Sequence, residues 1–456
     1  MPLTDTIAAI STPLGRGGIG IVRISGSEAL GILDKIFIPK GGRKPKSYSM
    51  RYGFAMDGQT VIDEVLASVM LGPNSYTTED VVEINCHGGM RAVRSVLELA
   101  LRSGARLAEP GEFTKRAFIN GRIDLIQVEA VMELIDAKSR KAEESAARRL
   151  AGSLSRKISS VRERILTLQA RIEVSIDYPE YEDEEIGSLE VRREAEAAME
   201  DLKSLIACFE RGRVFSEGLK VVIAGKPNVG KSSLLNALMN EDRAIVADIP
   251  GTTRDVLSEA ASLAGVPVKL MDTAGLRTPE DAIESLGVGK SIEALEDSDL
   301  AIWVVDSSEA LSEEDAEACA KLEGKKVIIV ANKNDLPKAA SMDELRTLIP
   351  EAPIVSVCAK DGLGLDGLES EISKMFLSGE AEMDDSEIYI NARQRQSAAK
   401  ALESLEKAAR AAGEGQAVDL ISIDLTDACD SLGEITGETA GDSLVDKIFK
   451  EFCVGK

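Results

Sequence analysis

Residues 225–232 read GKPNVGKS and directly follow an apolar run at Leu219–Ala224. This spacing, GxxxxGK[ST] after a strand and before a helix, is typical of a phosphate-binding loop. Its glycines let backbone N–H groups converge on phosphate oxygens, and the start of the next helix adds positive potential. We expect Lys231 to neutralise the terminal phosphates and the Ser232 hydroxyl to bind Mg²⁺. The alternative, an ordinary glycine turn, does not explain the strand–loop–helix context.

Short apolar runs alternate with helical stretches on either side of this loop. Alternating strands and helices favour a doubly wound α/β domain with a mostly parallel sheet, here over residues 216–378. The expected strands are Leu219–Ala224, Val266–Met271, Leu300–Val305, Lys326–Val330 and Pro353–Val357.

Two further segments indicate that the phosphate loop belongs to a guanine-nucleotide site. Asp272-Thr273-Ala274-Gly275 fits DxxG at a strand end, where an aspartate can hold the Mg²⁺ shell and a glycine N–H can contact the γ-phosphate. Asn332-Lys333-Asn334-Asp335 fits NKxD after the strand at Val327–Val330. The Asp335 carboxylate can accept two hydrogen bonds from guanine, a pair of donors that adenine lacks. The order of the three motifs predicts GTP as the nucleotide.

The regions outside this domain differ from it in their pattern of strand-like and helical runs. Residues 1–118 mix strand-like runs with glycine and helical stretches, which predicts an α+β domain. Residues 119–215 and 379–456 are helical, so the α/β domain is expected to be inserted into a helical bundle domain. Apolar residues from Leu150 to Ile172 recur at gaps of three and four, which predicts one long amphipathic helix.

Composition limits the classes of function. The chain has 456 residues, with 54 Lys and Arg against 78 Asp and Glu, a formal net charge of −24. Nucleic-acid binders usually carry a basic surface, so an RNA substrate would require a local basic patch or a basic partner. No apolar run approaches the ~18 residues of a membrane span, and no secretory leader is apparent. With six scattered cysteines, we expect a reduced, cytoplasmic protein without stable membrane insertion.

The nucleotide motifs resemble those of translation-factor-related GTPases. In that resemblance, the segment 249–255 is the first switch, and Thr253 contacts the γ-phosphate and Mg²⁺. The usual SAK motif reads Cys358-Ala359-Lys360 here, so Cys358 is a departure. Leu276 stands where Ras-like enzymes place a glutamine, so another group must orient water. The expected GTP-binding residues are Asn228, Val229, Gly230, Lys231, Ser232, Ser233, Thr253, Asp272, Thr273, Ala274, Gly275, Asn332, Lys333, Asp335, Cys358, Ala359 and Lys360.

The two ends of the chain carry more specific motifs. They include GRGGIGIVRISG at 15–26, EINCHGG at 83–89, PGEFTKRAF at 110–118, GEITGE at 433–438 and FCVGK at 452–456. Together these closely resemble the MnmE/TrmE family of tRNA-uridine-modifying GTPases, nearly end to end. The resemblance implies an N-terminal domain that binds a tetrahydrofolate derivative, in the 5-formyl or 5,10-methylene form, and forms a homodimer. It also implies a flavoprotein partner of the MnmG (GidA) type, which uses FAD and NADH, and a tRNA substrate modified at C5 of the wobble uridine.

The same resemblance assigns roles to individual residues. It implies that Glu284 is the catalytic glutamate. Without the resemblance, the sequence alone would favour a solvated helix residue at this position. Asn228 could bind K⁺ beside the phosphates, in the role of an arginine finger. The family adds Ala247, Ile249 and Thr252 to the K⁺ site, and places folate contacts at Arg23, Glu83, Arg122 and Lys456.

Cys453 and His87 are two further candidate residues. Cys453 lies in the terminal CxGK motif and is a candidate nucleophile or acid–base group near the folate, the alternative being a packed small residue. His87 is expected to be structural and packed beside its neighbouring glycines.

Two other functions stay open at this point. One is a ribosome-assembly GTPase that uses GTP only as a switch, which ribosome co-sedimentation would test. The other is a regulatory dimeric switch whose chemistry resides entirely in its partner. Folate binding by the isolated chain would separate that function from an enzyme of tRNA modification.

Overall fold

The computed structural model describes residues 5–41, 46–137, 139–177, 188–209, 212–214, 218–239, 259–263, 266–272, 295, 297–377 and 389–456. The chain forms two compact units. The first comprises residues 1–132, 148–200 and 397–456, and the second comprises residues 133–147 and 201–396. The boundaries proposed above, 118, 215 and 378, stay predictions.

A seven-stranded sheet in the order β3-β4-β5-β6-β2-β1-β7 forms the N-terminal part of the first unit. Apolar side chains on one face pack against the helices α1 and α2 to make its core. The other face carries Arg23 on β2 directly opposite Glu83 on β6. The elements are β1 (Ile7–Ile10), β2 (Ile19–Ser25), α1 (Ala29–Ile36), β3 (Phe37–Pro39), β4 (Ser49–Asp57), β5 (Thr60–Met70), β6 (Val81–His87), α2 (Met90–Arg102) and β7 (Arg106–Leu107).

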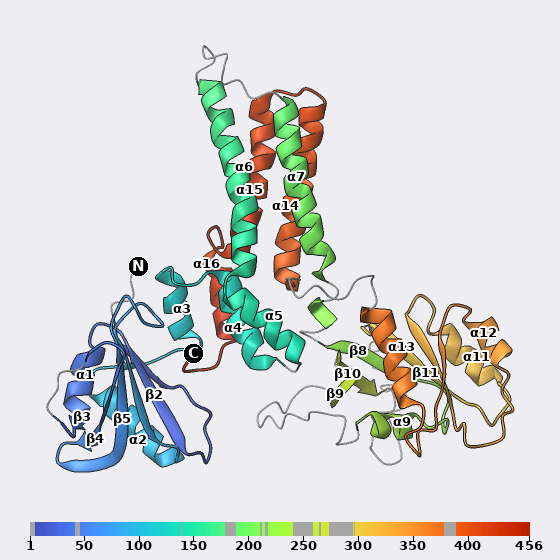
Figure 1. The fold of residues 1–456 in the computed structure, drawn as a ribbon, viewed down its shortest axis with the longest axis horizontal. Helices are drawn as coiled ribbons and strands as arrows, with labels where there is room; N and C mark the ends of the chain where they lie inside the picture. The colour runs from blue at the N-terminus through green and yellow to red at the C-terminus, as the bar shows by residue number, and fades with distance from the viewer. Residues whose placement is uncertain are drawn as a thin grey trace, which may run out of the picture. The chain divides into compact units, whose positions relative to one another are not determined.

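Long helices form the rest of the first unit, where α6, α7, α14 and α15 run side by side (Figure 1). The apolar stripe that starts at Leu154 is buried along α6, as its period predicts. Hydrogen bonds such as Gln169 to Thr426, at 2.7 Å, join α6 to α15. The helices are α3 (Glu112–Ile119), α4 (Leu125–Asp136), α6 (Ser153–Asp177), α7 (Ser188–Ala207), α14 (Ala392–Gly413), α15 (Val418–Thr436) and α16 (Asp442–Lys450). A further helix, α5 (Arg140–Leu150), falls mostly within residues 133–147 of the second unit.

The prediction of one continuous helix from Leu150 to Ile172 is wrong at its start. Leu150 ends α5, and α6 begins at Ser153. Between them Gly152 takes φ of +81°, a left-handed conformation that ends a helix. The apolar period alone did not reveal this break.

The second unit contains a six-stranded sheet in the order β13-β12-β11-β8-β10-β9. All of its pairs are parallel except β9 with β10, so the sheet is mostly parallel as predicted. Its strands and helices are β8 (Leu219–Ala224), α9 (Lys231–Leu238), β9 (Glu259–Leu263), β10 (Val266–Asp272), β11 (Leu300–Asp306), α11 (Glu313–Ala320), β12 (Val327–Asn332), α12 (Met342–Leu348), β13 (Ile354–Ser356) and α13 (Leu365–Leu377).

The carboxyl ends of the parallel strands meet at one edge of this sheet, the edge at which doubly wound folds bind ligands. The phosphate loop follows β8, Asn332 ends β12 and Cys358 follows β13. No helix in the described ranges has the length and apolarity to cross a bilayer.

Candidate nucleotide and folate sites

The phosphate loop joins β8 to α9 through two glycines with left-handed backbones. Gly225 has φ of +144° and Gly230 has φ of +99°. A Cβ at Gly225 would lie 2.3 Å from the carbonyl oxygen of Val304, and one at Gly230 would lie 2.2 Å from Nδ2 of Asn332. Both positions therefore exclude a side chain on steric as well as conformational grounds. The two glycines thus let the loop pack closely against β11 and Asn332.

Asn332 ties the phosphate loop to the loop after β13. Its Nδ2 donates to the carbonyl oxygen of Val229 at 2.8 Å. Its Oδ1 accepts from the backbone N–H of Ala359 at 3.0 Å. The first residue of NKxD thus holds two loops together while itself being 3% exposed. Asn332 therefore acts as a positioning residue for both ends of the site.

Lys231 and the polar residues beside it face the loop and solvent. The Lys231 ammonium donates to the carbonyl oxygens of Gly225 at 2.7 Å and Lys226 at 2.8 Å. Ser232, Ser233 and Asn228 are exposed, whereas Val229 is buried. Asn228 has φ of +64°, which asparagine tolerates better than most residues. Among the described residues, the Asn228, Ser232 and Ser233 side chains are therefore accessible to a ligand.

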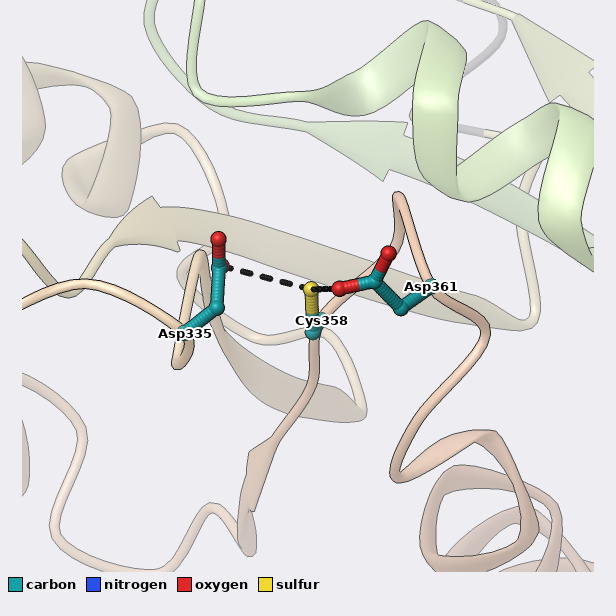
Figure 2. Close-up of side chains that lie close together, drawn as sticks. All are labelled: Asp335, Cys358 and Asp361. Atoms are coloured by element: carbon teal, nitrogen blue, oxygen red, sulfur yellow. Dashed lines mark hydrogen bonds between the residues drawn. The ribbon is translucent and has the colours of Figure 1, made fainter.

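The guanine end of the site combines Asp335, Cys358 and Asp361 (Figure 2). The Cys358 thiol lies 3.2 Å from an oxygen of Asp335 and 3.2 Å from an oxygen of Asp361. A hydrogen bond from the Asp361 backbone N–H lowers the pKa of Cys358, but burial and the two carboxylates outweigh it and the pKa lies above its ordinary value. The thiol is therefore a hydrogen-bond donor that can orient Asp335.

Two charged contacts near the nucleotide loops were missed by the sequence analysis. The Lys333 ammonium lies 2.5 Å from Asp306, the last residue of β11. Burial would raise the pKa of Asp306, but Lys333 and Ser308 outweigh it and hold the pKa below its usual value. Lys226 of the phosphate loop pairs with Asp315 at 3.1 Å. The signal for Asp306 was available, since it is a carboxylate at the end of an apolar strand.

Several predicted residues lie outside the described residues. They are Ala247, Ile249, Thr252, Thr253, Thr273, Ala274, Gly275 and Glu284. Asp272 ends β10, so its backbone lies at the expected strand end. The assignments of these residues stay predictions.

Two of the predicted folate residues, Arg23 and Arg122, lie over an aromatic ring that the sequence analysis missed. Arg23 donates to Glu83 at 2.8 Å. The guanidinium of Arg23 lies 5.4 Å from the centre of the Tyr76 ring, and that of Arg122 lies 4.6 Å from it. Tyr76 falls in a stretch without strand or helix pattern, so nothing in the sequence singled it out.

The C-terminal tail joins this cluster through Phe113. The Phe113 ring lies 5.5 Å from the Arg23 guanidinium, and the Phe113 backbone N–H donates to the carbonyl oxygen of Lys456 at 3.2 Å. Cys453 is exposed, and its carbonyl oxygen accepts from Gly111 at 3.3 Å. The four predicted folate positions are thus linked, Arg23 to Glu83 directly and the other two through Tyr76 and Phe113.

The prediction that His87 is packed beside its glycines is wrong. Its side chain is 71% exposed, because His87 ends β6 at the margin of the sheet. Its ring accepts or donates a hydrogen bond with Asp63 at 2.6 Å. The hydrogen bond with the Asp63 carboxylate raises the pKa of His87.

Comparison with known proteins decides the family. The sequence matches the MnmE helical domain over residues 125–453 and the N-terminus of the GTP-binding protein TrmE over residues 6–122. This chain belongs to the MnmE family. The prediction of the family is therefore confirmed, and the chain contains the N-terminal and helical domains of that family together with a P-loop domain.

Full-length relatives agree with this assignment. The tRNA modification GTPase MnmE of Thermoanaerobacter pseudethanolicus is 49% identical over 457 residues and covers 99% of both chains. The protein of the same name from Acetivibrio thermocellus is 45% identical over 455 residues, again covering 99% of both. Among solved structures, the G domain of the T. maritima FeoB iron transporter is 30% identical, covers 35% of this chain and 99% of that chain, and has a TM-score of 0.27.

A first prediction concerns the phosphate loop. We expect Gly230→Ala to lower GTP affinity at least about tenfold, since a left-handed alanine costs about 1–2 kcal/mol and its Cβ would also clash with Asn332. Fluorescent-nucleotide titration measures the change. Gly324→Ala is the matched control, because Gly324 has φ of +78° but open space around its Cβ position. Equal GTP affinity in the wild type and Gly230→Ala would contradict the prediction.

Proposed function

We propose that the protein is a K⁺-stimulated GTP hydrolase that modifies C5 of the wobble uridine in tRNA, using a folate one-carbon unit. Membership of a family whose relatives are named tRNA modification GTPases supports the GTPase activity and the tRNA substrate. Nucleotide binding is supported above all by the phosphate loop, which Asn332 links to the loop of Ala359.

The residues of the nucleotide site suit GTP, Mg²⁺ and K⁺. Lys231 binds the β- and γ-phosphates, the exposed Ser232 hydroxyl binds Mg²⁺ together with Thr253, and Asp335 accepts hydrogen bonds from guanine. Asn228 offers a side-chain carbonyl to K⁺, with Ala247, Ile249 and Thr252 as its proposed partners. Bound K⁺ supplies positive charge to the transition state, and Glu284 orients the attacking water through a second water.

The cluster around Tyr76 suits a folate. Glu83 can accept hydrogen bonds from the amino and ring N–H groups of a pterin. Arg23, Arg122 and Lys456 can pair with the carboxylates of its glutamate tail. Arg23 is 19% exposed and Glu83 22% exposed at their side chains, so both can reach a ligand. Cys453, exposed on the same tail as Lys456, is the proposed acid–base or nucleophilic group.

The proposal includes two protein partners, a second copy of this chain and a flavoprotein. The N-terminal domain forms a homodimer, and an MnmG (GidA)-type flavoprotein supplies FAD and NADH chemistry. The net charge of −24 favours a basic partner for contact with tRNA. We place the reaction in the cytoplasm.

Nucleoside analysis of tRNA tests this function. Cells that lack the protein should lose the C5 modification of wobble uridine, and the full chain should restore it. Lys231→Ala should fail to restore it, because the phosphate contact is lost. Unchanged wobble nucleosides in the deletion strain would reject the proposal.

The K⁺ site gives a second prediction. GTP hydrolysis should be faster in K⁺ than in Na⁺ by about tenfold or more, since a cation at the transition state replaces an arginine finger. Asn228→Ala should abolish this difference in steady-state phosphate release. Asn236→Ala, at another exposed asparagine six residues beyond Gly230, serves as the control. Equal rates in the two salts for the wild type would remove K⁺ from the mechanism.

A further inference from the structure

The guanine end of the site places one thiol beside two carboxylates, a combination that can also bind a metal ion. The Sγ of Cys358 and carboxylate oxygens of Asp335 and Asp361 all lie within 4.8 Å of one another, and no other such group occurs among the described residues. Figure 2 shows the thiol between the two carboxylates. The thiol is buried at 3% exposure, whereas both carboxylates are exposed. An ion from solvent can therefore reach a site whose sulfur is shielded.

The distances suit a tetrahedral metal ion. With Zn–S of about 2.3 Å and Zn–O of about 2.1 Å, the sulfur and oxygen of a tetrahedral site lie about 3.6 Å apart. Both S–O distances here are 3.2 Å. Small side-chain rotations therefore suffice to admit the ion.

Backbone hydrogen bonds hold the three ligands in place. The N–H of Cys358 donates to the carbonyl oxygen of Leu363 at 2.9 Å, and the N–H of Asp361 donates to that of Cys358 at 3.2 Å. The N–H of Asn334, beside Asp335, donates to the carbonyl oxygen of Val357 at 3.2 Å. The two loops are thus fixed to each other, and a site held in this way is preorganised for a metal.

We propose that Asp335, Cys358 and Asp361 form a Zn²⁺ site that competes with guanine nucleotides. A thiolate favours Zn²⁺ over Mg²⁺, and the serine of the usual SAK motif offers no such ligand. Binding replaces the thiol proton, which passes to solvent, and leaves a fourth position for water. The competition rests on the proposed role of Asp335, since a carboxylate bound to Zn²⁺ cannot accept the hydrogen bonds of guanine.

Metal titration of the full chain tests the site without nucleotide. Zn²⁺ binding is followed by competition with a chromophoric chelator, and Co²⁺ binding by its thiolate absorption. Cys358→Ser should weaken Zn²⁺ binding by about a hundredfold or more, and Asp361→Asn should weaken it at least about tenfold. Cys319→Ser, a partly buried cysteine of the same unit, is the matched control. Equal Zn²⁺ affinity in Cys358→Ser and the wild type overturns the site.

The competition is measured with GDP in the absence of Mg²⁺. GDP at ten times its dissociation constant should weaken the apparent Zn²⁺ affinity about tenfold. In the reverse experiment, Zn²⁺ should displace a fluorescently labelled GDP from the wild type but not from Cys358→Ser. Zn²⁺ binding that GDP leaves unchanged overturns the competition. Unchanged GTP affinity in Asp335→Asn would instead reject the guanine-reading role, while loss of Zn²⁺ in Cys358→Ser would still support the metal site.

Discussion

Asp335→Asn should lower GTP affinity about a thousandfold, because two charge-assisted hydrogen bonds of about 2 kcal/mol each are lost. The carboxylate accepts from guanine N1–H and from the exocyclic amino group, whereas the asparagine amide offers one acceptor and one donor group. Xanthine carries a carbonyl in place of that amino group, and the new amide can donate to it. The variant should therefore prefer XTP, and the ratio of GTP to XTP affinity should change by about 10⁴-fold or more.

Competition between GTP and XTP for a fluorescent nucleotide measures this exchange of specificity. Asp361→Asn is the matched control, since it removes an equal charge on the other side of Cys358, 3.2 Å from the thiol. It should leave the preference for GTP intact. A variant at Asp335 that still prefers GTP over XTP would show that another group reads the base.

The nucleotide site could be predicted from the sequence because its motifs are short and contiguous. A GxxxxGK[ST] run marks the loop locally, and Gly225 and Gly230 of that run have left-handed backbones in the fold. The reason that Gly230 cannot carry a side chain is not local, since it is the amide of Asn332, 102 residues further along the chain. The sequence predicted the residue types, and the fold supplied the contacts between them.

The contacts among the proposed folate residues could be predicted only in part. Arg23 and Glu83 were assigned by resemblance, and the sheet register places them opposite each other. Tyr76 and Phe113, which contact the arginines, come from a loop and from α3, where no periodicity marks them. Likewise β9 (Glu259–Leu263) escaped prediction because EAASL is short and only weakly apolar. Contacts made through tertiary structure leave no pattern along the chain.

Arg116→Met should destabilise the N-terminal sheet by about 3–5 kcal/mol, the usual cost of breaking a buried ion pair on one side. Arg116 is fully buried and donates to Asp5 at 2.8 Å, to Glu79 at 3.1 Å and to Glu112 at 3.0 Å. Methionine fills much of the same volume but leaves these carboxylates with less positive charge. Hydrogen exchange of β1 and β2 peptides in the full chain measures the loss locally. Arg102→Met is the control, because its pair with Asp57 is exposed and should contribute about 0–1 kcal/mol.

The pH dependence separates lost charge from lost packing. Burial would raise the pKa of Glu112, but hydrogen bonds from Arg106 and Arg116 outweigh it and the pKa lies below its ordinary value of 4.5. The pKa of Asp5 is likewise held below 3.8 against burial by the same two arginines. A lowered carboxylate pKa stabilises the fold above the unfolded value, and this contribution is lost as the pH falls through the folded value. Wild-type protection should thus decline below about pH 4. In Arg116→Met this decline should be shallower, because the folded pKa values move back toward the unfolded ones. A decline as steep as that of the wild type would mean that Arg116 acts through packing rather than charge.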